Sequence, residues 1–114
     1  MLTTVINGTE YTLATTLRVA YMVQGENNHK PYSKVFSDLG DMCIEDQIGI
    51  LYCAFKVANP DVLMPKKTFI DFYLDNTTIK QIMDQLKVLI QAITGVTDLD
   101  DATESAGTED VQGN

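Results

Sequence analysis

The sequence predicts a mainly α-helical protein, a small domain of about five helices with a short N-terminal β-hairpin and a disordered acidic C-terminal tail. Three observations support this fold class. Apolar residues recur at steps of three and four in the second half of the chain, an Asn-Gly pair separates two β-favouring runs near its start, and acidic residues dominate after residue 95. We therefore expect a helical domain over residues 1–95 and a disordered segment over residues 96–114.

The first stretch, "LTTVINGTEYTL", has the pattern of a β-hairpin. β-Favouring residues flank Asn7-Gly8, the pair preferred in a two-residue type I′ turn. The strands should run from Leu2 to Ile6 and from Glu10 to Leu13. Because two strands alone are marginally stable in water, the hairpin must lie on helices or pair with another copy.

Two helices are expected after the hairpin. Thr15 or Thr16 can cap the first helix, which Gly25 should end. A shorter helix is expected over residues 32–39, with Gly40 as its stop.

The next segment is expected to form the central helix of the core. Asp41 is the preferred N-cap, and Glu45 and Asp46 lie in the first turn, where the helix dipole favours acidic side chains. From there to Ala58 the residues are apolar on nearly every side, which would also suit a buried strand. The length favours a helix, because strands of more than a dozen residues are unusual.

Two further helices should complete the domain. The stretch "KKTFIDFYLDN" predicts a helix with three aromatic residues on one face, Phe69, Phe72 and Tyr73. Asn76 or Thr77 should cap the last helix, and Gly95 should end it. Its apolar residues follow the helical period: Ile79, Ile82, Met83, Leu86, Leu89, Ile90 and Ile93.

The charge is divided unevenly along the chain. The formal net charge is −8, and six acidic residues without any basic residue lie after residue 94. The preceding part carries eight basic and ten acidic residues and is nearly neutral. This balance argues against nucleic acid as a partner, because binding to phosphates needs clustered Lys and Arg.

Neither a membrane span nor a disulfide is expected. The longest apolar run, residues 48–55, is far shorter than the ~20 residues that span a bilayer. Cys43 and Cys53 are ten positions apart on the expected central helix, about 15 Å along its axis, so both should be free thiols.

The sequence contains no recognisable catalytic, cofactor or metal site, and we expect no enzymatic activity. His29 is the only histidine, and no glycine-rich phosphate loop or nucleophile motif is present. Asp98, Asp100 and Glu109 match three positions of a calcium-binding EF-hand loop. Thr103 stands where that loop requires glycine, so we reject this assignment.

The remaining feature is a surplus of methionine and tyrosine, with five of each in the chain. These residues are enriched at adaptable protein interfaces, although each could equally fill a gap between short helices. As candidates for contacts with a partner or with a second copy we name Tyr21, Met22, Tyr32, Phe36, Phe72, Tyr73, Met83 and Ile90.

The order of segments resembles the tail assembly chaperones of long-tailed, siphovirus-type bacteriophages and prophages, in particular those of Gram-positive hosts. The resemblance covers residues 2–95 and rests on the stretches "INGTEYTL", "TLRVAYMVQG", "IEDQIGILYCAFKVANP" and "FYLDNTTIKQIMDQLKVLIQAITG". It implies a protein without catalytic residues that coats the tape-measure protein in many copies before tail-tube subunits polymerise.

The resemblance also implies self-association into a ring or spiral, and a frameshifted longer form that contacts the tail-tube protein. The expected location is the host cell cytoplasm, and the protein is not expected in the mature virion. A helical adaptor that binds a single partner helix in an apolar groove would have the same composition and remains the main alternative. A small enzyme and a DNA-binding regulator are disfavoured by the missing site and by the charge.

Overall fold

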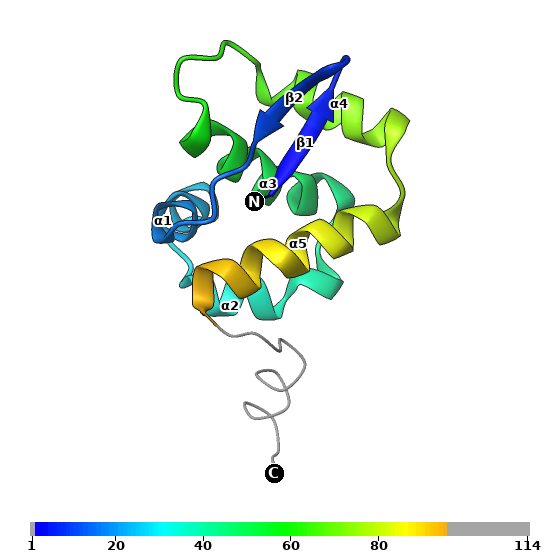
Figure 1. Ribbon diagram of the computed structural model, residues 1–114. Coiled ribbons are helices and arrows are strands. Elements are labelled where there is room, and N and C mark those ends of the chain that lie inside the picture. Colours follow the sequence, from blue (N-terminus) through cyan, green and yellow to red (C-terminus); the bar gives the residue numbers. More distant parts are fainter. Residues whose placement is uncertain (1, 96–114) are drawn as a thin grey trace.

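The structure is a computed structural model, and it describes residues 2–95 of the chain. In this part of the chain a two-stranded hairpin precedes five α-helices and one 3-10 helix (Figure 1). In chain order the elements are β1 (Thr3–Ile6), β2 (Thr9–Thr12), α1 (Leu17–Glu26), α2 (Tyr32–Ser37), the 3-10 helix η1 (Leu39–Asp41), α3 (Ile44–Ala58), α4 (Lys66–Asn76) and α5 (Ile79–Thr94). The mainly α fold with an N-terminal hairpin is confirmed. The predicted tail, residues 96–114, lies outside the described residues.

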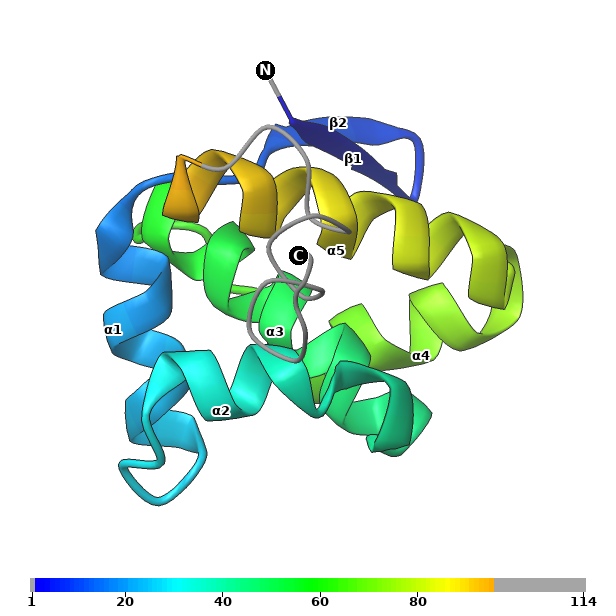
Figure 2. The same ribbon diagram turned by 90° about the horizontal axis from the view of Figure 1, so that it is seen from below.

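Helix α3 is the centre of the fold. Helices α1, α4 and α5 and strand β2 all contact it, and it lies between the hairpin and α5 on one side and α2 on the other (Figure 2). Its Ile48, Leu51 and Phe55 are inaccessible to solvent. A helix that is apolar on nearly every side needs such an enclosed position, so the predicted central helix is confirmed.

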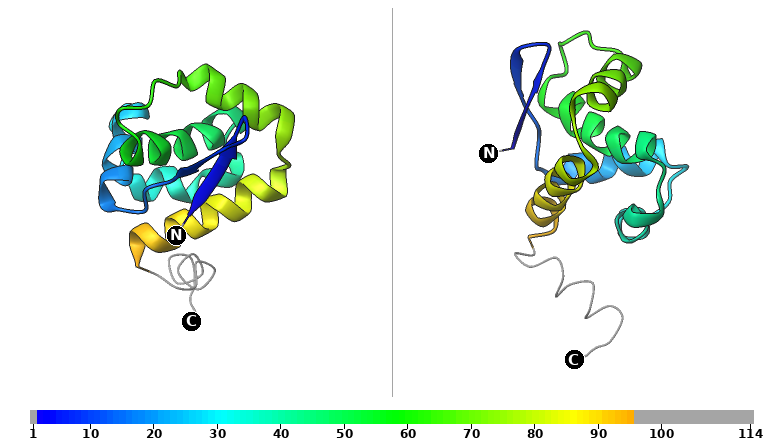
Figure 3. Two further views of the ribbon diagram at one scale, coloured as in Figure 1. Left: turned by 45° about the horizontal axis from the view of Figure 1, so that its top comes forward. Right: turned by 90° about the vertical axis from the view of Figure 1, so that its right-hand side faces the viewer.

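The hairpin turns as its sequence predicts. Asn7 and Gly8 have φ angles of 53° and 83°, and two positive φ angles are typical of a type I′ turn. The strands pair antiparallel with Ile6 opposite Thr9. Both strands are four residues long, and β2 begins one residue earlier than expected. The hairpin lies against the helical body on the side away from α2 (Figure 3).

A cluster of aromatic rings joins the hairpin to α3 and α4. Phe55 of α3 lies 5.1 Å from the ring of Tyr11 and 5.4 Å from that of Phe69, measured between ring centroids. Tyr52 packs on both phenylalanines, and Tyr73 stacks on Phe69 at 4.8 Å. These contacts bury aromatic area between the hairpin and two consecutive helices that lie far from it in the sequence.

Two hydrogen bonds, one from the backbone and one from a side chain, hold the end of the hairpin on the C-terminal end of α3. The Ala14 N–H donates to the Ala54 carbonyl at 3.0 Å. The Asn59 side-chain amide donates to the Thr12 carbonyl at 2.8 Å. The hairpin therefore packs on helices of its own chain, which is the first of the two arrangements expected from the sequence.

The predicted cap of the last helix is wrong, whereas its end is confirmed. Neither Asn76 nor Thr77 is the N-cap of α5. The Thr78 hydroxyl accepts from the Gln81 N–H at 3.2 Å, and the Gln81 side chain accepts from the Thr78 N–H at 2.8 Å. This reciprocal capping box makes Thr78 the N-cap, so α5 begins one residue later than a helix capped by Thr77 would. Gly95 ends the helix with a φ of 76°.

The start of the central helix also differs from the prediction. Gly40 and Asp41 belong to η1, which follows α2 directly, and Cys43 takes the N-cap position of α3. The Gln47 side chain donates to the carbonyl of Leu39 at 2.8 Å in a buried position. This bond and the burial of Leu39 favour an additional turn before the helix, which the Asp41 pattern does not reveal.

Helix α1 does not stop at Gly25. Its C-terminal end is closed by Asn27, whose side-chain amide donates to the Val23 carbonyl at 2.7 Å. The chain then reverses through Asn28 and His29, which have φ angles of 59° and 62°. Asparagine and histidine are enriched among the non-glycine residues that adopt this left-handed conformation, so the reversal does not depend on Gly25.

Candidate functional site

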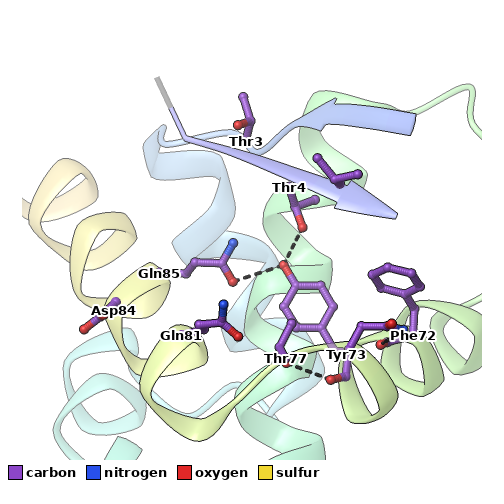
Figure 4. A pocket seen from close by; sticks show the side chains of 10 residues that line it. Thr3, Thr4, Phe72, Tyr73, Thr77, Gln81, Asp84 and Gln85 are labelled. Carbon is purple, nitrogen blue, oxygen red and sulfur yellow. Dashed lines mark hydrogen bonds between the residues drawn. The ribbon is translucent and has the colours of Figure 1, made fainter. Parts of the chain in front are cut away.

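A groove runs along the outer edge of β1, between this strand and the corner where α4 meets α5 (Figure 4). Its volume is about 470 Å³. We call it the β1 groove, and its lining consists of Thr3, Thr4, Val5, Phe72, Tyr73, Asn76, Thr77, Gln81, Asp84 and Gln85. Most of these side chains are hydroxyls and amides, so the groove suits hydrogen bonding more than acid–base chemistry.

The Tyr73 hydroxyl joins the two walls of the β1 groove. It donates to the Gln85 side-chain oxygen at 3.1 Å and accepts from the Thr4 hydroxyl at 2.7 Å (Figure 4). Burial raises the pKa of Tyr73, and the hydrogen bonds to Thr4 and Gln85 oppose this shift. The phenol is therefore protonated at neutral pH, and it links β1 to α4 and α5 structurally.

A second surface is the outer side of α1 together with α2. Leu17 and Tyr21, one helical turn apart on α1, are 69% and 74% exposed. The Gln24 side chain accepts from the backbone N–H of Tyr32 at 2.9 Å, which joins the start of α2 to α1. Tyr32 meets Phe36 edge to face, with ring centroids 5.9 Å apart. We call Leu17, Tyr21, Met22, Tyr32 and Phe36 the α1–α2 surface.

The structure separates the eight candidate contact residues into three groups. Four of them belong to the α1–α2 surface: Tyr21, Met22, Tyr32 and Phe36. Phe72 lines the β1 groove, and Met83 is half-buried on α5. Tyr73 and Ile90 are core residues, only 1% and 2% exposed, although Tyr73 also lines the β1 groove. Such burial disfavours a direct contact, and a role of these two residues in binding stays a prediction.

Several exposed apolar residues were missed by the sequence analysis. Leu17 of α1 is 69% exposed and was not among the candidates, and Leu63, in the loop before α4, is 96% exposed. Helical periodicity could have excluded Ile90 from the candidates, because it lies in the middle of the apolar stripe of α5. It could not identify Leu63, since a loop residue has no periodicity to indicate its exposure.

The two cysteines are free, as predicted. Cys43 is exposed, and Cys53 is a core residue of α3 with 3% exposure. Burial raises the pKa of the Cys53 thiol from 9.0 to about 12; the Glu26 carboxylate adds to this shift, and Lys66 opposes it. A buried protonated thiol of this kind is chemically unreactive.

Cys53 should make the protein less stable at alkaline pH. The pKa of the Cys53 thiol is higher in the folded state than in the unfolded state, so the protonated thiol contributes to the free energy of unfolding. This contribution is complete below pH 9.0 and is lost as the pH rises towards 12. The free energy of unfolding should fall in this range by up to about 1.4 kcal/mol per pH unit. Urea denaturation at several pH values between 8 and about 11.5 measures this slope.

The variant Cys53→Ala is the control for this prediction. Tyr52 and Tyr73 also have pKa values raised by burial, so some alkaline sensitivity should persist in the variant. The slope between pH 9 and 10 should nevertheless become shallower, because the tyrosines ionise later. Identical slopes in both proteins would show that Cys53 ionises without hindrance in the folded state.

Other kinds of site have no counterpart in the described part of the chain. Between residues 2 and 95 no three His, Cys, Asp or Glu side chains gather where they could hold a metal ion. No helix in the same range is long and apolar enough to cross a membrane. Comparisons of the chain with protein-family models, with curated proteins and with solved structures gave no match.

Proposed function

We propose that this protein is a phage tail assembly chaperone, which binds the tape-measure protein in many copies before the tail tube polymerises. The observation that carries the proposal is the α1–α2 surface. It presents Leu17 and Tyr21 to solvent, although the core of the same small domain is complete without them. Exposed apolar residues grouped on one surface are typical of a protein-binding site.

The geometry of this surface fits a helical client. Leu17 and Tyr21 are four residues apart on α1 and form one apolar row along that helix. The apolar stripe of a client helix can pack against such a row, with Arg18 at its border available to an acidic client residue. The described domain is nearly neutral, so association does not depend on long-range attraction between opposite charges.

The proposal includes further partners and a location. The copies on one client contact each other and form a ring or spiral, and a longer frameshifted form recruits the tail-tube protein. The protein acts in the host cell cytoplasm and is absent from the finished virion. No catalytic step, cofactor, nucleic acid or membrane takes part.

The test is binding to the tape-measure protein encoded in the same phage genome, followed by light scattering over a concentration series. The expected complex contains many copies per client chain. The variant Tyr21→Asp should weaken binding at least about tenfold, because it introduces a charge into an apolar contact. Leu74→Asp is the matched control, since Leu74 is also exposed, at 53%, but lies on α4 outside the α1–α2 surface.

Two outcomes would overturn the proposal. A complex with one copy per client chain, in which Tyr21→Asp still weakens binding at least about tenfold, would indicate the alternative function, a helical adaptor that binds a single partner helix. Equal binding by Tyr21→Asp and Leu74→Asp would show that the α1–α2 surface does not contact the client.

A further inference from the structure

The two edges of the hairpin differ in what covers them. The Leu13 N–H donates to the Leu2 carbonyl, so in this register Thr4 and Tyr11 form a pair joined by backbone hydrogen bonds. Hydrogen-bonded pairs alternate with pairs that are not bonded, so the backbone N–H and C=O groups of Thr3 and Val5 point away from β2. On the outer edge of β2, the Asn59 side chain satisfies the Thr12 carbonyl. On the outer edge of β1, no backbone hydrogen bond from Thr3 or Val5 to any other described residue is present.

The edge of β1 lacks most of the features that usually prevent strand addition. Its four residues, Thr3–Ile6, include no charge and no proline, and the pairing with β2 has no bulge. Thr3 and Val5 line the β1 groove, which keeps space open beside the strand. Unpaired backbone groups next to open space select an extended polypeptide as the occupant, because only a strand offers donors and acceptors at the matching interval.

The charges around this edge indicate which strand fits. The only charged residue that lines the β1 groove is Asp84, and its carboxylate is paired with Lys80 at 2.8 Å. An uncharged, β-favouring strand therefore meets neither attraction nor repulsion there. β1 itself is uncharged and β-favouring. The β1 strands of two copies can therefore pair along their free edges without placing like charges opposite each other.

We propose that β1 pairs antiparallel with β1 of a second copy, and that the two hairpins form one four-stranded sheet. Thr3 of each copy lies opposite Val5 of the other, and the two Thr4 residues meet at the twofold axis. This is the register in which the free backbone groups of both strands face each other, and it gives about four hydrogen bonds. Both helical bodies then lie on the same face of the sheet.

The pairing is independent of the proposed function. It uses the β1 edge and leaves the α1–α2 surface free, so a client can bind either to single copies or to dimers. A twofold contact closes after two copies and does not itself produce a ring or spiral. Two four-residue strands bury far less than the ~1,200 Å² of a stable interface. The dimer should therefore form reversibly and depend on protein concentration.

Analytical ultracentrifugation of the unliganded protein up to millimolar concentration tests the proposal. The wild type should shift from monomer to dimer, and Val5→Pro should remain monomeric because proline removes an N–H on the free edge. Glu10→Pro is the matched control. It makes the same change at the cross-strand neighbour of Val5, on the edge of β2 that the proposal leaves unpaired. Glu10→Pro should dimerise like the wild type, and circular dichroism should show both variants folded.

Cross-linking tests the register in the same preparations. In a Cys43→Ser background, chains with Thr3→Cys should form mixed disulfides with chains carrying Val5→Cys, since paired Cα atoms about 5.5 Å apart are within disulfide range. Thr3→Cys chains alone should cross-link at least tenfold more slowly. A monomer at every concentration, equal dimerisation by Val5→Pro, or cross-linking in another register would overturn the proposal. Loss of the cross-link on adding the tape-measure protein would instead assign the edge to an extended segment of the client.

Discussion

Replacing Phe55 with alanine is expected to lower the free energy of unfolding by about 3–5 kcal/mol, the range for truncating a fully buried phenylalanine. Phe55 is inaccessible to solvent and touches the rings of Tyr11, Tyr52 and Phe69. The substitution therefore removes buried area and also the contact through which the hairpin packs on α3. Urea denaturation followed by circular dichroism gives the difference.

Leu74→Ala is the control for this measurement. Leu74 lies on α4, next to the same region of the fold, but is 53% exposed. Its truncation should change stability by no more than about 0.5 kcal/mol, as is usual for surface positions. A loss below about 1 kcal/mol for Phe55→Ala would mean that the aromatic cluster does not hold the hairpin on the helices.

Much of this fold could be predicted from the sequence, because its strongest signals are local. The apolar period of α5 and the continuous apolar content of α3 identify both helices without knowledge of their neighbours. The Asn7-Gly8 turn is equally local, since it depends only on the φ angles that these residues tolerate. Local patterns of this kind persist in the folded protein when the packing agrees with them.

The helix ends were predicted less well, because several candidates for each cap lie close together. Thr77 and Thr78 are both suitable N-cap residues, and only the reciprocal bonds with Gln81 decide between them. The turn before α3 depends on a buried bond from Gln47 to the Leu39 carbonyl, which joins positions eight residues apart. A local sequence pattern does not reveal helix ends that depend on particular side-chain hydrogen bonds in the folded structure.

The candidate surfaces could be predicted only in part. The surplus of tyrosine and methionine led to α1 and α2, but could not distinguish exposed Tyr21 from buried Tyr73. Tyrosine suits both environments, because its ring is apolar and its hydroxyl needs a partner. The β1 groove was not predicted at all, since it combines a strand edge with a helix corner about seventy residues further along the chain.

Tyr73→Phe should show how strongly the corner between α4 and α5 is bound to the hairpin. The free energy of unfolding is expected to fall by about 1–3 kcal/mol. The substitution keeps the ring stacked on Phe69 and removes only the hydroxyl. The hydroxyl of Thr4, a residue that is 8% exposed, then loses its acceptor, and the Gln85 side-chain oxygen loses its donor. Leaving a buried polar group without a partner costs more than an average hydrogen bond contributes.

Hydrogen exchange should locate the effect of Tyr73→Phe within the molecule. The amides that pair β1 with β2 should lose protection, whereas those in the middle of α3 should change only as much as global stability does, because the hydroxyl bridges elements outside that helix. Tyr21→Phe removes the same group from a side chain that is 74% exposed, and it should leave both stability and exchange unchanged. If the Tyr73 and Tyr21 variants were equally stable, the Thr4–Tyr73–Gln85 link would be dispensable, and the hairpin would depend on the aromatic cluster and the backbone bonds to α3 alone.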